Sequence, residues 1–139
     1  MYAAGMLLDW LRTKWSTLLL SATAAALLAV LSLLAIQKYI GWEVTATGSR
    51  AMQQFSGDRV EALVKLVDCE QCFLPQRNRA VWALGEMGNP RALAVLQRRH
   101  TGGKCDHGHA LCQYELGKAI KKIQGTWGLL PYLARTRRQ

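Results

Sequence analysis

The residue types that can do chemistry gather in two clusters of cysteine and histidine. Cys69 and Cys72 form a C-x2-C pair. The second cluster begins 33 residues after Cys72 and holds two more cysteines with two histidines between them: Cys105, His107, His109 and Cys112. Four cysteines in a chain of 139 residues predict a cross-link or a metal site, depending on the compartment.

Two kinds of cross-link fit these residues. Disulfides would join Cys69 to Cys72 and Cys105 to Cys112, as in an oxidising compartment. The alternative is a tetrahedral structural zinc site with four cysteines, or with three cysteines and one histidine; its candidate ligands are Cys69, Cys72, Cys105, His107 and Cys112. A third interpretation treats the cysteines as small apolar side chains. We take the disulfides first, because the topology argued below favours an oxidising side, and the interspersed histidines are irregular for a zinc site.

Other chemistry lacks the residues that it requires. His107 and His109 could act as general bases, but no constellation of a nucleophile with a carboxylate accompanies them. Phe73 stands where a haem-attachment motif needs histidine. No glycine-rich phosphate loop follows a strand pattern. We therefore predict no catalytic residues, no enzyme activity, no small-molecule substrate and no cofactor, with zinc as the single alternative.

The elements that position these clusters are short amphipathic helices. Apolar residues share one helical face from residue 80 to 87: Ala80, Ala83, Leu84 and Met87. Gly88, Asn89 and Pro90 predict the end of that helix and the start of another, as C′ glycine, N-cap and first helical residue. The second helix carries Leu93 and Leu96 back toward the first. The unit is a pair of antiparallel helices joined by a three-residue turn.

This helix pair is repeated on both sides. Residues 61–66 match residues 91–96 with an offset of 30, and the apolar positions Leu116, Ala119, Ile120 and Ile123 repeat those of residues 80–87 with an offset of 36. A period in the thirties built from helix pairs predicts an all-α fold, with a short α-solenoid over residues 58–125. Equivalent connections stack along one edge of a solenoid, so the two cysteine clusters are expected to be neighbours.

Residues 77–96 resemble a known family of repeats. They fit the pattern R-x-x-A-x-x-A-L-G-x-x-G-(D/N)-x-x-A-(L/I)-x-x-L throughout, from Arg77 to Leu96. This stretch is similar to the short HEAT-like repeat also found in phycobilin lyases. The resemblance implies a protein-binding scaffold. It does not imply the lyase activity of one branch, because nothing in the chain matches a chromophore site.

The N-terminal third predicts a membrane anchor. Residues 1–16 form an amphipathic lead, and residues 17–36 hold no charge and are dominated by leucine and alanine. Twenty helical residues span roughly 30 Å, the thickness of the hydrocarbon core. Lysine and aromatic residues flank the run on both sides, which is typical of interfacial anchors. We predict a retained transmembrane helix over residues 17–40; a cleaved signal peptide and a buried core helix are the alternatives.

Topology follows less directly, because lysine and arginine nearly balance at the two ends of the span. We expect the N-terminus inside an inner or plasma membrane and the C-terminal domain on the periplasmic side. Residues 41–57 are expected to form a linker with a short helix capped by Ser49. Residues 126–139 form an apolar and then basic tail, which either caps the last repeat or docks on a partner.

From Gly41 on, Lys and Arg number 15 against 8 Asp and Glu, and this basic bias is either an ordinary solvated face or a surface for an acidic protein or anionic lipid. Nucleic acid is not expected, because no aromatic residues are interleaved with the basic ones. Candidate partner-binding residues are Arg91, Arg98, Arg99, Trp127 and Tyr132. The sequence thus predicts a non-enzymatic, membrane-anchored adaptor or accessory subunit that holds a partner protein at the bilayer. The alternative is a membrane-tethered domain that binds zinc or is redox-active.

Overall fold

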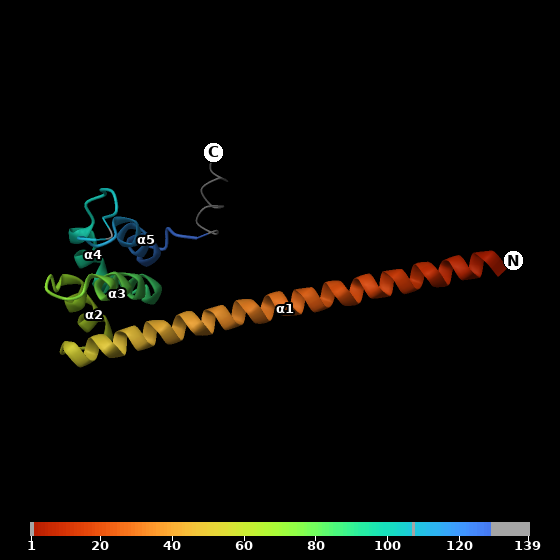
Figure 1. Ribbon diagram of the computed structural model, residues 1–139, viewed down its shortest axis with the longest axis horizontal. Helices are drawn as coiled ribbons and strands as arrows, with labels where there is room; N and C mark the ends of the chain where they lie inside the picture. The colour runs from red at the N-terminus through yellow and green to blue at the C-terminus, as the bar shows by residue number, and fades with distance from the viewer. Residues whose placement is uncertain (1, 107, 129–139) are drawn as a thin grey trace. The chain divides into compact units, whose positions relative to one another are not determined.

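The computed structural model describes the backbone of residues 2–106 and 108–128, and side chains from residue 14 onward within these ranges. This part of the chain is all helical and contains no strand. Its elements, drawn in Figure 1, are α1 (Tyr2–Gln54), α2 (Arg59–Asp68), α3 (Leu74–Met87), the 3-10 turn η1 (Pro90–Ala92), α4 (Leu93–Arg99) and α5 (Gln113–Ile123). The chain divides into two compact units, Met1–Gly41 and Trp42–Gln139.

Helix α1 is one unbroken element of 53 residues (Figure 1). The separate short helix expected within residues 41–57 is therefore wrong, and Ser49 lies inside α1 instead of capping a new helix. Gly41 and Gly48 weaken a helix by about 1 kcal/mol each but do not end it, and no proline is present to break it. Burial of the apolar side chains of Val44 and Ala51 in the second unit stabilises the continuation. The amphipathic face predicted for residues 1–16 falls largely on side chains outside the described part.

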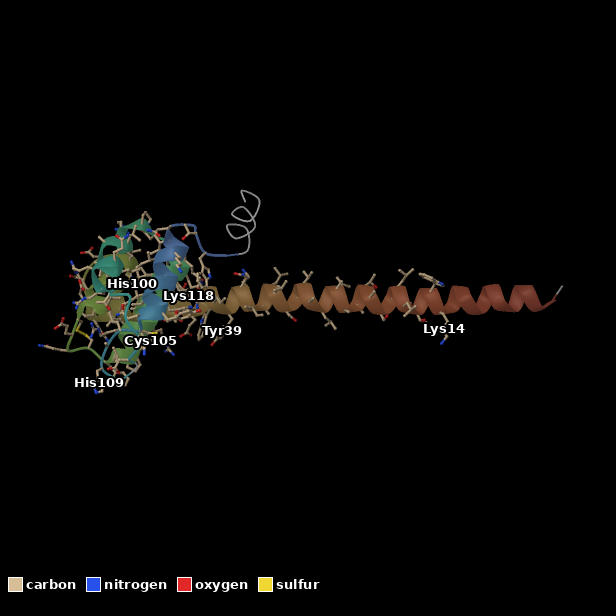
Figure 2. All side chains as sticks on the ribbon, turned by 90° about the horizontal axis from the view of Figure 1, so that it is seen from above. Lys14, Tyr39, His100, Cys105, His109 and Lys118 are labelled. Atoms are coloured by element: carbon tan, nitrogen blue, oxygen red, sulfur yellow. A yellow bond between two sulfur atoms is a disulfide. The ribbon has the colours of Figure 1, made fainter. Side chains whose placement is uncertain are left out.

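The first unit presents an apolar helix with exposed side chains. Leucine, valine and isoleucine side chains from Leu18 to Ile36 are 53–69% exposed (Figure 2). The hydroxyls of the serine and threonine residues here donate to backbone carbonyls one turn back, for example Ser21 to Leu18 at 2.9 Å and Ser32 to Leu28 at 2.8 Å. Within the described residues, α1 contains one stretch long and apolar enough to cross a membrane.

The second unit is built around α3, which packs against α2 and α5, while α4 packs against α5. Its largest fully buried side chains are Leu63, Leu84, Leu96, Leu116, Val67 and Val81. They come from α2, α3, α4 and α5. Each of these short helices has a single apolar face, so all four are required to enclose one core.

Contacts between α3 and α5 occur in the same order along both helices. Asn78 meets Cys112, Gly85 meets Ala119, and Glu86 forms an ion pair with Lys122. The two helices are therefore parallel, with an offset of 34 to 36 residues, as equivalent helices of successive repeats are. The contact at Gly85 is so close that an added Cβ would lie 2.8 Å from the Cα of Ala119. The glycine of the repeat pattern thus permits this approach.

The predicted turn between α3 and η1 is present. Gly88 adopts the left-handed conformation with φ 63°, and the Asn89 side chain accepts a hydrogen bond from the Arg91 N–H at 3.0 Å. Asp58 caps α2 in a similar way, accepting from the Glu61 N–H at 2.9 Å. That backbone N–H, together with the Arg91 guanidinium 2.6 Å away, lowers the pKa of Asp58. Local sequence signals thus set both helix starts.

Candidate functional site

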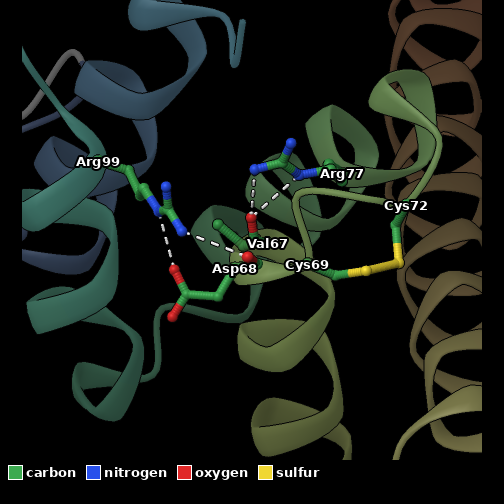
Figure 3. The surroundings of a disulfide bond; sticks show 6 residues. All are labelled: Val67, Asp68, Cys69, Cys72, Arg77 and Arg99. Carbon is green, nitrogen blue, oxygen red and sulfur yellow. Dashed lines mark hydrogen bonds and ion pairs between the residues drawn. A yellow bond between two sulfur atoms is a disulfide. The ribbon is translucent and has the colours of Figure 1, made fainter.

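The first cysteine cluster is a closed turn between α2 and α3. Asp68 ends α2, and Cys69 and Cys72 are joined by a disulfide with a Cα–Cα distance of 5.3 Å (Figure 3). The Cys72 N–H donates to the Cys69 carbonyl at 3.2 Å, so the backbone itself turns back between the two residues. In this state neither sulfur is a thiolate available to a metal.

Beside this turn, the buried Arg77 joins the start of α3 to the end of α2. Its guanidinium donates twice to the Val67 carbonyl, from Nε at 3.1 Å and from Nη2 at 2.9 Å (Figure 3). Val67 lies in the last turn of α2, where carbonyls have no partner within the helix and cations are stabilised. The first arginine of the repeat pattern is therefore a cap for the preceding helix.

The three arginines predicted to bind a partner all form ion pairs with acidic residues of α2, of its N-cap or of the loop after it. Arg98 approaches Asp68 at 2.5 Å, and Arg99 approaches Asp68 at 2.9 Å and Glu70 at 3.0 Å. Glu70 and then Asp68 raise the pKa of Arg99. Arg91 pairs with Asp58 at the other end of α2. These contacts align α2 with η1 and α4 in the same direction, about 30 residues apart in sequence. Arg98 keeps 63% of its side chain exposed.

The second cysteine cluster lies on the loop between α4 and α5, which is organised by Asp106. The Asp106 carboxylate accepts from the N–H of Gly108 at 3.0 Å and of His109 at 3.3 Å, and the Asp106 carbonyl accepts from Ala110 N–H at 3.2 Å. The Gly108 N–H and then the His109 ring, which lies 3.2 Å from the carboxylate, lower the pKa of Asp106. This turn reverses the chain between Cys105 and the buried Cys112. His107 lies outside the described residues.

Cys105 and Cys112 face each other as free thiols, with their Sγ atoms 3.0 Å apart. The Cys105 sulfur also accepts from the Tyr114 N–H in the first turn of α5, at 3.2 Å. The Cys112 thiol and then the Tyr114 N–H lower the pKa of Cys105. Burial, and then the neighbouring Cys105, raise the pKa of Cys112. The expected pair is thus brought together, but it is not bonded, and one thiol ionises before the other.

Cys105 opens onto a depression of about 310 Å³ formed by the α4–α5 loop, α5 and Trp127. Figure 2 places Cys105, His100 and Lys118 close together on this part of the unit. Lys118 lies over the Tyr114 ring at 6.0 Å, and Lys121 lies over the Trp127 ring at 5.9 Å. Of the two aromatic residues predicted in the tail, Trp127 is therefore part of this site. Tyr132 lies outside the described residues.

The two cysteine loops are neighbours, although their sulfurs form two separate pairs. Glu70 of the first loop and His109 and Leu111 of the second line one depression of about 520 Å³, together with Arg98 and Arg99. Within the residues that the structure describes, no three His, Cys, Asp or Glu side chains converge on a point that can hold a metal. The ligand set proposed for zinc is therefore not assembled from these residues.

Sequence reasoning missed the groups that organise the second cluster. Asp106 could have been recognised, because aspartate followed by glycine two residues later is typical of a side-chain-capped turn. The Asn78 side chain, which accepts from the Cys112 N–H at 2.9 Å, comes from α3 and leaves no local signal. Lys118 and Lys121 could have been placed near Tyr114 from helical spacing, but their position beside Cys105 depends on the loop.

Comparison with known proteins identifies the central helix pair. The family described as PBS lyase HEAT-like repeat matches residues 76–99, which comprise most of α3, η1 and α4. The match confirms a HEAT-like repeat in the segment where the sequence pattern predicts one. No curated protein and no solved structure matches the chain.

Proposed function

We propose that the chain is a non-enzymatic membrane-anchored adaptor, in which a short HEAT-like α-solenoid holds a partner protein at the bilayer. The observation that carries this proposal is the pairing of two features in one chain. An apolar helix with 53–69% exposed leucine, valine and isoleucine side chains leads directly into a small helical unit that contains a HEAT-like repeat. Such exposure is costly in water and is relieved by lipid.

The repeat character of the second unit supports a binding role. The parallel contacts of α3 with α5, and the ion pairs that join α2 and its N-cap to η1 and α4, support the proposal that further repeats lie on both sides of the matched one. Stacked helix pairs of this kind present continuous surfaces to partners. The arginines first assigned to partner binding are balanced by Asp58, Asp68 and Glu70, so charge alone is a weak basis for recognition.

Exposed aromatic side chains indicate the face that binds the partner. Phe73 precedes α3 and is 69% exposed, and Tyr114 lies in the first turn of α5 and is 62% exposed. Because α3 and α5 are parallel, both residues lie toward the N-terminal edge of these helices, with Tyr114 further along, level with Ala80. Aromatic residues are enriched in protein interfaces. We propose this edge as the contact surface, with the periplasmic side of an inner or plasma membrane as its location. The disulfide at Cys69 and Cys72 is in keeping with an oxidising side.

Site-specific photo-crosslinking in native membranes tests the adaptor role. A photoreactive phenylalanine analogue replaces Phe73 or Tyr114, and Glu61 on α2, which is 52% exposed, serves as the matched control position. We expect one discrete protein adduct from positions 73 and 114 and none from position 61. Equal labelling at all three positions, or adducts with lipid alone, would remove the proposal.

The anchor is tested separately by alkaline extraction of membranes. The full chain should stay in the pellet with its N-terminal segment intact by mass. A Leu28→Arg/Leu31→Arg variant should be released, because each central arginine costs about 2.5–3.5 kcal/mol of insertion free energy. A wild-type chain found in the supernatant would contradict the membrane anchor. A chain cleaved after the apolar run would identify that run as a signal sequence.

A further inference from the structure

We infer that Cys105 and Cys112 form a thiol–disulfide exchange site, which is oxidised to a disulfide by a low-molecular-weight disulfide that carries carboxylates. The inference concerns the α4–α5 loop and does not depend on the adaptor role. It departs from the expectation that the chain takes no small-molecule substrate. The geometry of the two thiols, the unequal access to them and the charge of the adjoining depression each point to it.

The geometry of the thiols is already close to that of the product. Their Sγ atoms are 3.0 Å apart, against about 2.05 Å in a disulfide, so bond formation requires a displacement of about 1 Å. The loop between them is held by the Asp106 turn, and the Cys112 N–H is fixed on Asn78 of α3. Little ordering of the chain remains to be done when the bond forms.

The two thiols differ in the way that an attacking and a resolving cysteine differ. Cys105 is half-buried and lines the depression, whereas Cys112 is 6% exposed and lies behind it. The Tyr114 N–H points at the Cys105 sulfur from the N-terminal turn of α5, a helix of 11 residues. A backbone donor at a helix N-terminus stabilises a thiolate. An incoming disulfide therefore meets Cys105 first.

The depression beside Cys105 favours negative charge. Among the residues that the structure describes, Lys118 and Lys121 line it, and no acidic side chain does. Glu115 lies 3.6 Å from Lys118 and partly neutralises its charge. Lys121, which lies over the Trp127 ring, therefore attracts an anionic ligand more strongly than Lys118 does. A volume of about 310 Å³ suits a small ligand better than a folded protein loop. The ligand class is therefore a small anionic disulfide.

The exchange proceeds in two steps that balance without a further reactant. The Cys105 thiolate attacks one sulfur of the external disulfide, whose S–S bond breaks to release one thiolate, leaving a mixed disulfide on Cys105. Cys112 then loses its proton and attacks the Cys105 sulfur, and the second external thiolate leaves. The chain loses two protons and two electrons, and the external disulfide becomes two thiols.

The test uses the full chain in lipid nanodiscs, reduced and then mixed with oxidised glutathione as the anionic probe or cystamine as the cationic probe. Trypsin cuts after Lys104 and Lys118, so one peptide carries Cys105 and Cys112, while Cys69 and Cys72 lie together on another. Acid quenching, alkylation and mass spectrometry therefore follow each pair separately.

We expect the Cys105–Cys112 disulfide to form faster with oxidised glutathione than in a synthetic peptide of residues 105–118. Cys112→Ser should accumulate a mixed disulfide on Cys105, and Cys105→Ser should form no adduct on this time scale. A folded chain that reacts no faster than the peptide overturns the inference, as does a Cys105→Ser variant that is modified at Cys112 at the wild-type rate. The comparison of the folded wild-type chain with the peptide tests the inference even if a variant misfolds.

Charge recognition is read from the ratio of the two probe rates. A unit charge about 10 Å away changes the rate of a charged probe about twofold at low ionic strength, in opposite directions for an anion and a cation. Lys118→Gln/Lys121→Gln should therefore lower the glutathione-to-cystamine ratio about tenfold, while Lys65→Gln on α2, the matched control, leaves it unchanged. An equal ratio in all three chains overturns the anionic ligand class.

Discussion

Replacement of Arg77 tests whether the first arginine of the repeat is a helix cap. Arg77→Met keeps an apolar stem of similar length but removes both donors to the Val67 carbonyl. Hydrogen bonds from charged donors contribute about 1.5–3 kcal/mol, and a cation at a helix C-terminus adds about 0.3–1 kcal/mol. Removal of a buried charge recovers part of this through its desolvation free energy. We expect a net loss of about 2 kcal/mol in the free energy of unfolding.

The assay is thermal unfolding of the full chain in detergent micelles, followed by tryptophan fluorescence, because Trp82 lies on α3 within the repeat unit. A loss of about 2 kcal/mol lowers the midpoint of a unit of this size by about 10 °C. Arg77→Lys, which keeps the charge but not the two-pronged donor, should lose about half as much. Arg59→Met on the exposed start of α2 is the control and should change stability by less than about 0.5 kcal/mol. Wild-type stability in Arg77→Met would refute the reasoning.

Three further predictions concern packing, charge and the disulfide. Gly85→Ala should lower the free energy of unfolding in urea by about 1–2 kcal/mol, because the added Cβ would meet the backbone of Ala119. Gly41→Ala should not destabilise the chain, because the Cβ added there has no other atom within 4 Å. Asp58→Asn keeps the helix cap but loses the charge. Because the pKa of Asp58 is lowered in the folded state, the carboxylate contributes to the free energy of unfolding above the unfolded pKa of about 3.9, and this contribution is lost as pH falls through the folded pKa. In urea unfolding the variant should therefore be less stable than wild type at pH 7 and equally stable near pH 2. Cys69→Ser should cost about 2 kcal/mol under oxidising conditions and nothing after reduction, since the bond closes a short loop. Equal loss in both conditions would assign the effect to the side chain instead.

Local signals in the sequence predicted the helix pair and its turn well. The spacing of Ala80, Ala83 and Leu84 placed one apolar face, and all three side chains are buried in α3. Gly88 and Asn89 act as predicted, because a left-handed residue and a side-chain cap depend on a few adjacent residues. The same locality explains why each cysteine was paired with the partner it actually contacts, only a few residues away.

Predictions that depended on distant segments fared differently. The linker between anchor and domain is helical to Gln54, because Val44 and Ala51 are buried against a surface that no local pattern predicts. Zinc ligation requires sulfurs from two loops to converge; the loops adjoin and the sulfurs lie in two separate pairs, while the zinc site itself stays a prediction. Loop adjacency follows from repeat length, whereas side-chain direction depends on packing.

The amino-acid sequence by itself determined the helical periodicity, the repeat and the long apolar run, because each is set by contacts within a few residues or by composition. Only the tertiary structure decided the role of the charged groups. Arg99 was assigned to a partner, but folding places Asp68 and Glu70 within 3.0 Å of it. Cys105 acquires a donor, a second thiol and a basic depression from segments that meet only after α4 and α5 have packed. Coulomb and hydrogen-bond energies depend on distances in space, and those distances arise from the packed core.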